Sequence, residues 1–370
     1  MSKHRYLYDI IYSTLKQEIL NDIYPTGTLL PSERCICERF GVERTTARKA
    51  LDLLVGKGLV EKRPGVGSEV VYNRNKGMGG TGGERKIIGF VIDDEKNTKK
   101  ITEPYYADLF YHLERECDTN DHQLIYISIH DVADLIEVTR KTSFCAIIFA
   151  TKTKREIIEH AMSEKIPVVL INESYSGAVS IFCDHSQGAK LALDYLLEMG
   201  HRRIGFITGP DSYLSSDYKM MRCTKSIQDY GLAMYKEDII AGQWTYQSGY
   251  DAAQKLICQR QPLDRPTAIF AFNDMMAIGA MRAMRKAGIS VPRDVSVIGF
   301  DNMEHLKFSE PDLTTIDGNS AELARITVHN IVSTDLDVYS EGVKILVPVS
   351  LIKRKTVSKA SVQLGSLMLS

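Results

Sequence analysis

The stretch from Leu30 to Val60, LPSERCICERFGVERTTARKALDLLVGKGLV, predicts two short helices joined by a tight turn. Ser32 can cap the first helix by accepting a hydrogen bond from a free backbone amide, and Glu33 suits the positive end of the helix dipole. We expect this helix to end near Phe40, because Gly41 provides the tight turn. A second helix is predicted to begin near Glu43.

The second predicted helix has an apolar face and a polar face. Its apolar side chains recur every three or four residues, which is the helical period: Ala47, Ala50, Leu51, Leu54 and Val55. The polar face of its first turns consists of Arg44, Thr45, Thr46, Arg48 and Lys49. Arg can donate two hydrogen bonds to a guanine edge, while Thr, Lys and helix-end amides suit phosphate oxygens. The pattern favours DNA binding, and a protein-interaction module with a charged helix surface is the alternative.

Two further elements surround these helices. Residues 6–21 predict a supporting helix, whose inward side chains would be Ile10, Ile11, Leu15, Ile19 and Leu20. After Gly58, the alternating runs 59–63 and 68–72 flank a turn at 64–67. This arrangement predicts a small β-hairpin, or wing.

Residues 6–72 resemble the winged helix-turn-helix domain of the GntR family of bacterial transcription regulators. The motifs L-P-S-E-R, F-G-V, R-T-T and K-G-L-V stand in the order and spacing of that family. The resemblance implies that six residues contact DNA: Arg34, Arg44, Thr45, Thr46, Arg48 and Gly65. Two positions differ from the family pattern, since Glu43 replaces a small hydroxyl residue and Val66 replaces a polar or basic residue at the wing tip.

Length and charge are consistent with a DNA-binding domain joined to a larger one. A chain of 370 residues fits two or three domains. Residues 1–76 have 13 Lys and Arg against 9 Asp and Glu, a net charge of +4, so the rest of the chain has a net charge of −5. The basic excess therefore lies in the predicted DNA-binding domain, as phosphate neutralisation requires.

Cysteine usage and hydropathy predict a cytoplasmic protein. The seven cysteines are odd in number and scattered, which favours free thiols over a disulfide framework or a metal site. The N-terminus lacks a signal-peptide core, and no apolar run reaches the roughly 18 residues that span a bilayer. We expect no membrane association, no metal and no cofactor.

A glycine-rich stretch separates the predicted domains. It contains a G-x-G-x-x-G match at Gly77, Gly79 and Gly82, but this match leads into a strand instead of linking a strand to a phosphate-binding helix. A flexible tether is therefore favoured over a dinucleotide site. The predicted domains are a winged helix-turn-helix at 1–72, a linker at 73–85, a two-lobed ligand-binding and dimerisation domain at 86–358 and a tail at 359–370.

From Lys86 onward, short apolar runs alternate with helical patterns. Strands are predicted at 87–92, 124–128, 146–149, 168–171, 204–208, 268–271 and 295–300. Helices are predicted at 106–119, 131–141, 153–164, 186–199, 218–230, 247–260 and 275–287. This alternation indicates an α/β fold with two doubly wound parallel sheets, in which ligands bind beyond the carboxyl ends of the strands.

Residues 86–355 resemble the effector domain of the lactose and galactose repressor (LacI/GalR) family, which is itself similar to the periplasmic sugar-binding proteins. The resemblance lies in MGHRRIGFITGP at 199–210, the block PTAIFAFNDMMAIGAMRAMRKAGISVPRDVSVIGFDN at 266–302, PDLTTID at 311–317 and VPVSLIKRKT at 347–356. A GntR-type domain joined to this effector domain is the arrangement of arabinose-repressor-type regulators. It implies a homodimer that binds a small sugar, a pentose such as arabinose or a related sugar.

The family's ligand positions correspond to residues of suitable chemistry for a sugar: Tyr105, Tyr106, Asn172, Arg222, Trp244, Asn273 and Asp301. Sugar binding needs an aromatic face and polar groups that pair with hydroxyls. Each residue also has a structural alternative: the aromatic residues can be core, Asn273 can cap a helix, and Arg222 and Asp301 can form a salt bridge. One departure is Asp317-Gly318, where the family commonly has a Gln that contacts the ligand.

The sequence as a whole predicts a sugar-responsive transcription regulator, a repressor, that binds operator DNA as a homodimer. The alternatives are an enzyme or a sugar-binding protein whose N-terminal domain contacts other proteins. Against an enzyme, the chain has no G-x-S-x-G elbow, no zinc-ligand spacing and no phosphate loop in a suitable context.

Overall fold

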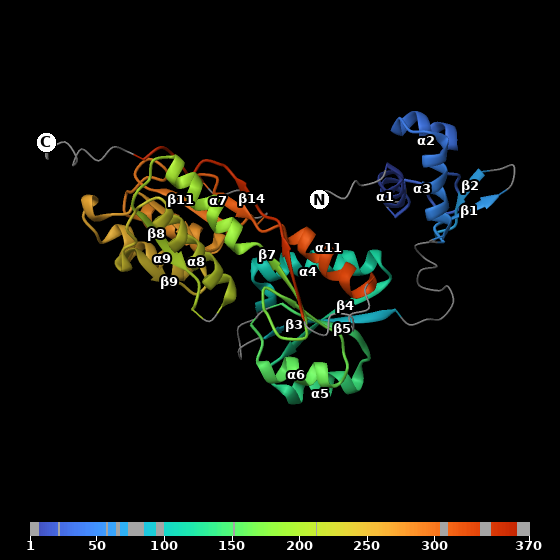
Figure 1. Cartoon of the computed structure of the whole chain (residues 1–370), viewed down its shortest axis with the longest axis horizontal. Coiled ribbons are helices and arrows are strands. Elements are labelled where there is room, and N and C mark those ends of the chain that lie inside the picture. The colour runs from blue at the N-terminus through green and yellow to red at the C-terminus, as the bar shows by residue number, and fades with distance from the viewer. Residues whose placement is uncertain are drawn as a thin grey trace. The chain divides into compact units, whose positions relative to one another are not determined.

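The computed structural model describes residues 7–20, 23–56, 58–63, 67–72, 85–93, 100–150, 152–211, 213–303, 310–333 and 342–360. The chain divides into two compact units, Met1–Glu84 and Arg85–Ser370, which are called the N-terminal unit and the C-terminal unit below (Figure 1). The predicted linker, apart from Arg85, and nearly all of the predicted tail lie outside the described residues.

The N-terminal unit contains three helices and a two-stranded hairpin. The helices are α1 (Leu7–Leu20), α2 (Glu33–Phe40) and α3 (Arg44–Gly56), and the strands are β1 (Val60–Arg63) and β2 (Gly67–Val70). The strands pair antiparallel, with Val60 opposite Val70. A winged helix-turn-helix was predicted, and this order of elements confirms it.

The turn between α2 and α3 forms for the predicted reasons. The Cys35 amide donates a hydrogen bond of 3.3 Å to Ser32 Oγ, so Ser32 is the N-cap of α2. Gly41 has a φ of 63°, a left-handed conformation that costs glycine little, and it ends α2. The apolar faces of α1 and α3 pack against each other in a core that includes Leu15, Ala47 and Leu54.

The C-terminal unit consists of two lobes, each built on a six-stranded sheet. In lobe 1 the strand order is β13-β7-β6-β5-β3-β4, and every pairing is parallel. Its strands are β3 (Lys86–Asp93), β4 (His122–Ile129), β5 (Phe144–Phe149), β6 (Val168–Ile171), β7 (Val179–Cys183) and β13 (Val343–Val347). Helices α4 (Pro104–Thr119) and α11 (Ser320–Ser333) cover one face of the sheet, and α5 (Val132–Lys141) and α6 (Arg155–Ser163) cover the other (Figure 1).

In lobe 2 the strand order is β14-β12-β11-β10-β8-β9, and only β14 runs antiparallel to its neighbour. The strands are β8 (Ile204–Thr208), β9 (Ile239–Ala241), β10 (Ala268–Ala271), β11 (Ser296–Asp301), β12 (Thr314–Asp317) and β14 (Ser350–Ile352). The helices are α7 (His185–Glu198), α8 (Leu214–Asp229), α9 (Tyr246–Ala253) and α10 (Asp274–Lys286). The central strands are buried on both faces, which explains their continuous apolar runs.

The chain passes between the lobes three times. The passages follow β7, β12 and β13, and the segment at the end of β13 accepts a hydrogen bond from each of the other two. The Asp184 amide donates to the Val347 carbonyl at 2.9 Å, and Asn319 Nδ2 donates to the Pro348 carbonyl at 3.4 Å. These contacts form a compact hinge between the lobes.

The structure confirms the predicted fold class, an N-terminal winged helix-turn-helix followed by two parallel α/β sheets. Among the described residues, no helix is long and apolar enough to cross a membrane.

Candidate functional sites

The polar face of α3 forms an exposed surface together with the start of α2. Arg34, Arg44, Thr45 and Arg48 are exposed, and Thr46 is partly buried. The guanidiniums of Arg44 and Arg48 both donate to the Glu33 carboxylate, and Arg34 Nε donates to Glu38 at 2.9 Å. Gly65 and Val66 at the wing tip lie outside the described residues.

Lys49 differs from the other predicted DNA contacts. Its ammonium lies 3.9 Å from the centre of the Tyr8 ring, a cation–π contact that directs it toward α1. Glu43, the unusual residue before α3, accepts hydrogen bonds from the Thr46 and Ala47 amides through its backbone carbonyl. The start of α3 therefore forms with an acidic residue at this position.

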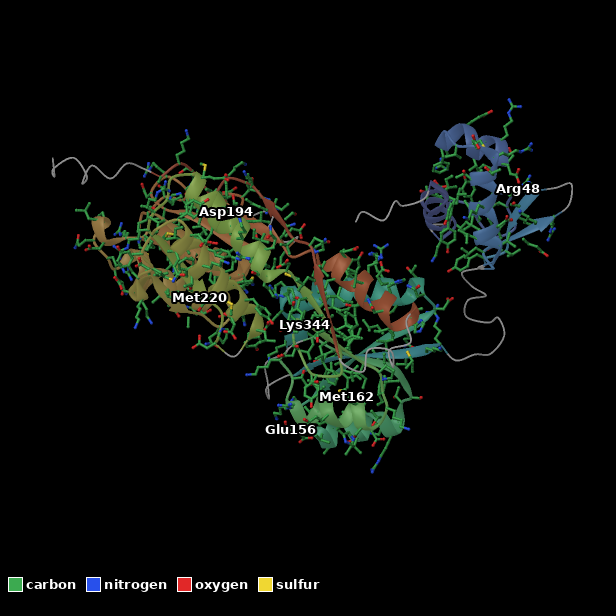
Figure 2. All side chains as sticks on the ribbon, viewed as in Figure 1. Arg48, Glu156, Met162, Asp194, Met220 and Lys344 are labelled. Atoms are coloured by element: carbon green, nitrogen blue, oxygen red, sulfur yellow. The ribbon has the colours of Figure 1, made fainter. Side chains whose placement is uncertain are left out.

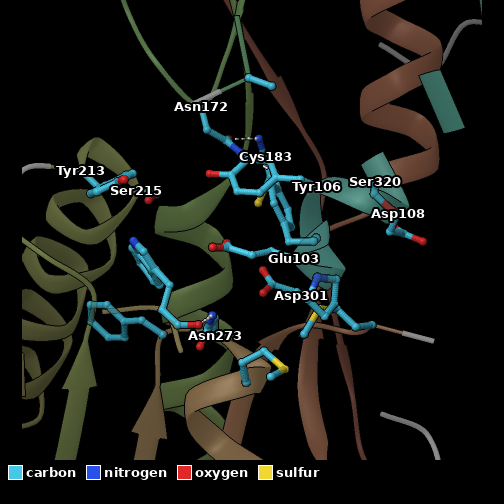
Figure 3. Close-up of a pocket in the computed structure, with 18 of the residues that line it drawn as sticks. Glu103, Tyr106, Asp108, Asn172, Cys183, Tyr213, Ser215, Asn273, Asp301 and Ser320 are labelled. Atoms are coloured by element: carbon cyan, nitrogen blue, oxygen red, sulfur yellow. Dashed lines mark hydrogen bonds between the residues drawn. The ribbon is translucent and has the colours of Figure 1, made fainter. Parts of the chain in front are cut away.

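A cavity of about 450 Å³ lies between the two lobes of the C-terminal unit. Six of the seven predicted ligand residues line it: Tyr105, Tyr106, Asn172, Trp244, Asn273 and Asp301. Figure 3 shows Asn172 and Tyr106 on one side of this space and Asn273 and Asp301 on another. Residues far apart in the sequence thus converge at the carboxyl ends of the strands, as expected for this class of sheet.

The lobe 1 wall is a connected polar network. Asn172 Nδ2 donates to the Tyr105 hydroxyl at 2.8 Å, and Asn172 Oδ1 accepts from the Cys183 amide at 3.2 Å. His185 Nε2 lies 3.0 Å from the same oxygen, and its Nδ1 lies 3.4 Å from Cys183 Sγ. Burial lowers the pKa of His185 well below its ordinary value, so the imidazole is neutral.

The lobe 2 wall is organised around Trp244. A Cβ built on Gly209 would lie 2.0 Å from the indole Cζ2, so only glycine permits the indole to lie there. The Trp244 carbonyl accepts a hydrogen bond of 2.8 Å from Asn273 Nδ2. Asn273 Oδ1 also accepts from the Met276 amide at 2.9 Å, which makes Asn273 the N-cap of α10 as well as a cavity residue.

Lys219 and Asp301 bring opposite charges to the cavity. Lys219 is 3% exposed, and its ammonium donates to the Phe272 carbonyl at 2.8 Å and lies 3.7 Å from the centre of the Phe300 ring. Burial lowers the pKa of Lys219 and raises that of Asp301, while the attraction between the two groups opposes both shifts.

Arg222 was predicted to contact the ligand, but it is not among the cavity-lining residues. Its Nε donates to Ser186 Oγ at 3.2 Å, toward α7. Lys219 lies one helical turn earlier on α8 and lines the cavity instead. The predicted helix began at residue 218, whereas α8 begins at Leu214.

Sequence reasoning also missed His185 and Tyr213, which line the cavity together with Gly318 at the position where the family commonly has a Gln. His185 and Gly318 lie at two of the passages between the lobes, and these passages could be found only by predicting β7, β12 and α11. Gly318 adds no side chain to the wall, and Asp317 accepts a hydrogen bond from the Asn319 amide at 2.9 Å instead of lining the cavity.

Asp274 is buried at the start of α10 and hydrogen-bonds to β12 and to the segment that follows β11. Thr315 Oγ1 donates to its Oδ1 at 2.5 Å, and the Met303 amide donates to its Oδ2 at 3.2 Å. Burial raises the pKa of Asp274 to about 7 from an ordinary value of 3.8. Since the pKa is raised by folding, the stabilising contribution is fully present below the unfolded value and is lost as the pH rises through about 7.

Replacing Asp274 with Asn should remove this loss of stability. The amide can donate to Thr315 Oγ1 and accept from the Met303 amide, as a protonated carboxyl group would. We expect the advantage of the Asp274→Asn variant over the wild type in free energy of unfolding to be larger at about pH 8 than at about pH 5 by on the order of 1 kcal/mol. Urea unfolding at both pH values measures this difference, and an equal difference at the two values would contradict it.

The His, Cys, Asp and Glu side chains form no candidate metal site in the part of the chain that the structure describes. No cluster of three or more His, Cys, Asp or Glu side chains has suitable geometry there. All seven cysteines are free thiols.

Family models match both units. Residues 7–70 match the model described as "Bacterial regulatory proteins, gntR family", and residues 193–357 match a periplasmic-binding-protein-like domain. A curated relative, the HTH-type transcriptional repressor PurR of Edwardsiella ictaluri, is 32% identical over 224 residues. That match covers 58% of this chain and 64% of the repressor, somewhat less than two thirds of its length.

Solved structures share the fold of the C-terminal unit. A transcriptional regulator LacI from Bacillus cereus subsp. cytotoxis has a TM-score of 0.68 at 23% identity, with 75% of this chain and all of that chain covered. A LacI-family regulator from Enterococcus faecium, solved with bound ribose, has a TM-score of 0.65 at 24% identity, with 75% and 100% covered. The chain therefore joins a winged helix-turn-helix domain that matches the gntR family model to a domain with the periplasmic-binding-protein-like fold.

Proposed function

We propose that the protein is a DNA-binding transcription repressor whose affinity for its operator is changed by an uncharged sugar bound between the two lobes. The observation that carries this proposal is the cavity, because it is lined by both lobes and adjoins the hinge in a chain that also has a helix-turn-helix. The relative PurR is a transcriptional repressor, which supports the same function here.

The N-terminal unit supplies the DNA-binding surface. The exposed Arg44, Thr45 and Arg48 on α3 suit base edges and phosphates in the major groove, and Arg34 lies near the start of α2. Two copies of the chain, paired through their C-terminal units, would present two such surfaces to a pseudo-palindromic operator. Pairing would also double the positive charge available to neutralise phosphates.

The lining of the cavity favours a sugar. Trp244, Tyr213 and Tyr106 offer aromatic faces for the C–H surface of a sugar ring, while Asp301 and Asn273 offer polar groups for hydroxyls. The ribose bound to the Enterococcus faecium regulator supports this ligand class. A pentose such as arabinose fits the volume of about 450 Å³ with room to spare.

The charges in the cavity favour an uncharged sugar over a phosphorylated one. Three carboxylates, Glu103, Asp108 and Asp301, line the cavity, together with the two ammonium groups of Lys152 and Lys219. Lys219 already donates to the Phe272 carbonyl and interacts with Asp301. A phosphate would therefore meet more acidic than basic side chains.

Backbone strain at the cavity supports a functional role. Asn172, Trp244 and Asp301 have φ values of 56°, 61° and 117°, which non-glycine residues rarely adopt. Such conformations cost about 1–3 kcal/mol each and concentrate at binding sites, where the surrounding structure maintains them. Three of the residues proposed to contact the ligand have this property.

The hinge gives the ligand a way to change DNA binding. A sugar that contacts both lobes favours the closed arrangement by the difference between its affinities for the closed and open forms. Cys183 and Gly318, which line the cavity, lie next to two of the three passages. Closure would therefore alter the surface through which two copies pair, and so the spacing of their DNA-binding units.

The proposed function is tested by DNA binding. Purified protein should prefer a promoter fragment from its own genomic neighbourhood over a scrambled fragment of equal length, and one sugar should change that preference. Binding is measured at low and moderate salt, because phosphate contacts depend strongly on ionic strength. A protein that prefers no such fragment, with or without sugars, would rule out the proposal, and turnover of the sugar would favour an enzyme.

A thermal-shift screen tests the ligand class. We expect an uncharged pentose or hexose to raise the melting temperature of the C-terminal unit, since a ligand at 100 times its Kd adds about 2.7 kcal/mol of stability. The phosphate ester of the same sugar should bind at least about tenfold more weakly because of the carboxylates in the cavity. A shift with phosphate esters alone would contradict the uncharged ligand, and no shift with any sugar would contradict the assignment of the cavity.

A further inference from the structure

Tyr218 joins the two lobes outside the cavity. It lies on α8 in lobe 2, and the centre of its ring is 5.9 Å from that of Phe182 on β7 in lobe 1, with the rings edge to face at 76°. Its hydroxyl accepts a hydrogen bond of 3.4 Å from Lys344 Nζ on β13, also in lobe 1 (Figure 2, Lys344 labelled). None of these three residues lines the cavity. The contact therefore links the lobes through protein side chains alone.

The sheet of lobe 1 presents both partners of Tyr218 on one face. β7 and β13 are parallel neighbours with Leu346 opposite Phe182, so Lys344, two residues before Leu346, lies on the same side of the sheet as Phe182. Ile181 points the other way, into the core under α4 and α11. Phe182 is only 2% exposed, and the Tyr218 ring packs on it from the other lobe. Separation of the lobes would therefore uncover an aromatic side chain of lobe 1.

Helix α8 connects this contact to the wall of the cavity. Lys219, the residue after Tyr218, lines the cavity. Successive residues of a helix differ in direction by about 100°, so Lys219 faces the cavity while Tyr218 faces lobe 1. On the opposite wall, Cys183 lines the cavity and directly follows Phe182 on β7. A rotation that separates the two walls must therefore also pull Tyr218 away from lobe 1.

The lobes are closed in the described arrangement. Cys183 and Lys219, which come from opposite walls of the cavity, are 5% and 3% exposed. Burial raises the pKa of the Cys183 thiol to about 12, and the charge of the Lys219 ammonium opposes this rise, so the two walls lie close together. The contact of Tyr218 with lobe 1 belongs to this closed arrangement.

We propose that the contact of Tyr218 with Phe182 and Lys344 is a latch that favours lobe closure before any ligand binds. The inference goes beyond the proposed function, because it concerns the lobes alone and requires neither sugar nor DNA. A latch of this kind raises the affinity for a ligand that needs the closed form, since part of the free energy of closure is supplied in advance. If Tyr218 only stabilised the fold, its removal would not change the balance between open and closed lobes.

Alkylation of the native cysteines tests the latch. Full-length protein without ligand is treated with iodoacetamide, and peptide mass spectrometry gives the rate at each thiol. Cys183 on the cavity wall reports opening of the lobes, because the thiolate is the reactive form and closure suppresses it. Cys117 and Cys223, buried in the cores of lobes 1 and 2, report unfolding. The rate at Cys183 should depend weakly on urea and the other two strongly, because opening exposes less surface than unfolding does.

We expect Tyr218→Ala to raise the rate at Cys183 by about fivefold, the factor that corresponds to about 1 kcal/mol for an aromatic pair. The matched control is Ile227→Val, which removes a buried methyl group from the same helix and destabilises lobe 2 to a similar extent. It should raise the rate at Cys223 and leave the rate at Cys183 unchanged. Tyr218→Phe keeps the ring and loses only the hydrogen bond from Lys344, so its rate at Cys183 should rise by about twofold.

The rate at Cys183 decides the inference. An unchanged rate in Tyr218→Ala, or an equal rise in Ile227→Val, would overturn the latch and leave the proposed function intact. If Tyr218→Ala does not fold, Tyr218→Phe decides in its place, and an unchanged rate at Cys183 in that variant would overturn the latch. Failure of the protein to bind any sugar or promoter would overturn the proposed function and leave the latch standing, because alkylation is measured without either.

Discussion

Replacing Lys219 with Met should lower the free energy of unfolding of the C-terminal unit by on the order of 3 kcal/mol, because it leaves the charge of Asp301 without its buried counterpart. The Lys219 ammonium donates to the Phe272 carbonyl, and its charge is the largest influence that opposes the rise of the Asp301 pKa on burial. Met preserves most of the volume of the side chain, so the loss reports on charge and hydrogen bonding more than on packing.

The same variant should lose its thermal shift with the effector sugar. Lys219 and Asp301 both line the cavity. Removing the Lys219 ammonium leaves Asp301 without its buried polar partner in the proposed binding site. The double variant Lys219→Met with Asp301→Asn is the matched control, because it removes both charges together. It should recover stability relative to Lys219→Met alone but not sugar binding.

The pH dependence separates this explanation from a packing defect. An uncompensated Asp301 costs most when it is ionised, so Lys219→Met should be more destabilised at about pH 8 than at about pH 5. Urea unfolding at the two pH values measures the difference. A destabilisation that is the same at both values, and is not relieved by Asp301→Asn, would contradict the role assigned to the charge.

The N-terminal unit could be predicted almost completely, because its signals are local. Ser32, Gly41 and the apolar spacing of α3 each act within a few residues of their position in the sequence. Lys49 shows where this reasoning ends. Helical periodicity places it on the polar face, but its contact with Tyr8 depends on how α1 packs against α3, which local sequence does not determine.

In the C-terminal unit, the buried central strands could be predicted from the sequence. The short edge strands, and the helix and strand through which the chain returns to lobe 1, could not. The runs at β6, β8 and β10 are continuous and apolar, as strands buried on both faces require. By contrast, β13 alternates buried and exposed residues at the edge of lobe 1, and β9 and β14 have only three residues each. The return of the chain to lobe 1 through α11 and β13 is a tertiary property, so the hinge could not be predicted from local patterns.

The cavity residues at strand ends were predictable for the same reason as the strands. Asn172, Asn273 and Asp301 each stand at the carboxyl end of a strand, where parallel sheets place their ligands. Lys219 was not found, because its place depends on the register of α8 and not on its composition. Arg222 was chosen because it resembled a ligand position of the family, and its side chain lies toward Ser186 instead of in the cavity wall.

Replacing Arg44 with Ala should weaken binding to the preferred promoter fragment by about 1–3 kcal/mol, or about 5-fold to 150-fold, if its guanidinium pairs with a guanine. Arg44 is the first residue of α3, where recognition helices approach the bases, and its side chain is 75% exposed. The change should leave the fold intact, because exposed ion pairs such as Arg44 with Glu33 contribute little stability. Quantitative mobility-shift or anisotropy titrations measure the loss.

Lys49→Ala is the matched control within the same helix. It also removes one positive charge, but the Lys49 ammonium packs against Tyr8, so we expect a smaller loss of operator affinity than for Arg44→Ala. The salt dependence then distinguishes the kinds of contact, since loss of a phosphate contact lowers the slope of log affinity against log salt by about 1 and weakens all sequences alike. A base contact by Arg44 requires instead that binding to the scrambled fragment changes little. If Arg44→Ala weakened both fragments equally, with the reduced slope, Arg44 would be a phosphate contact, and sequence recognition would lie elsewhere on α3.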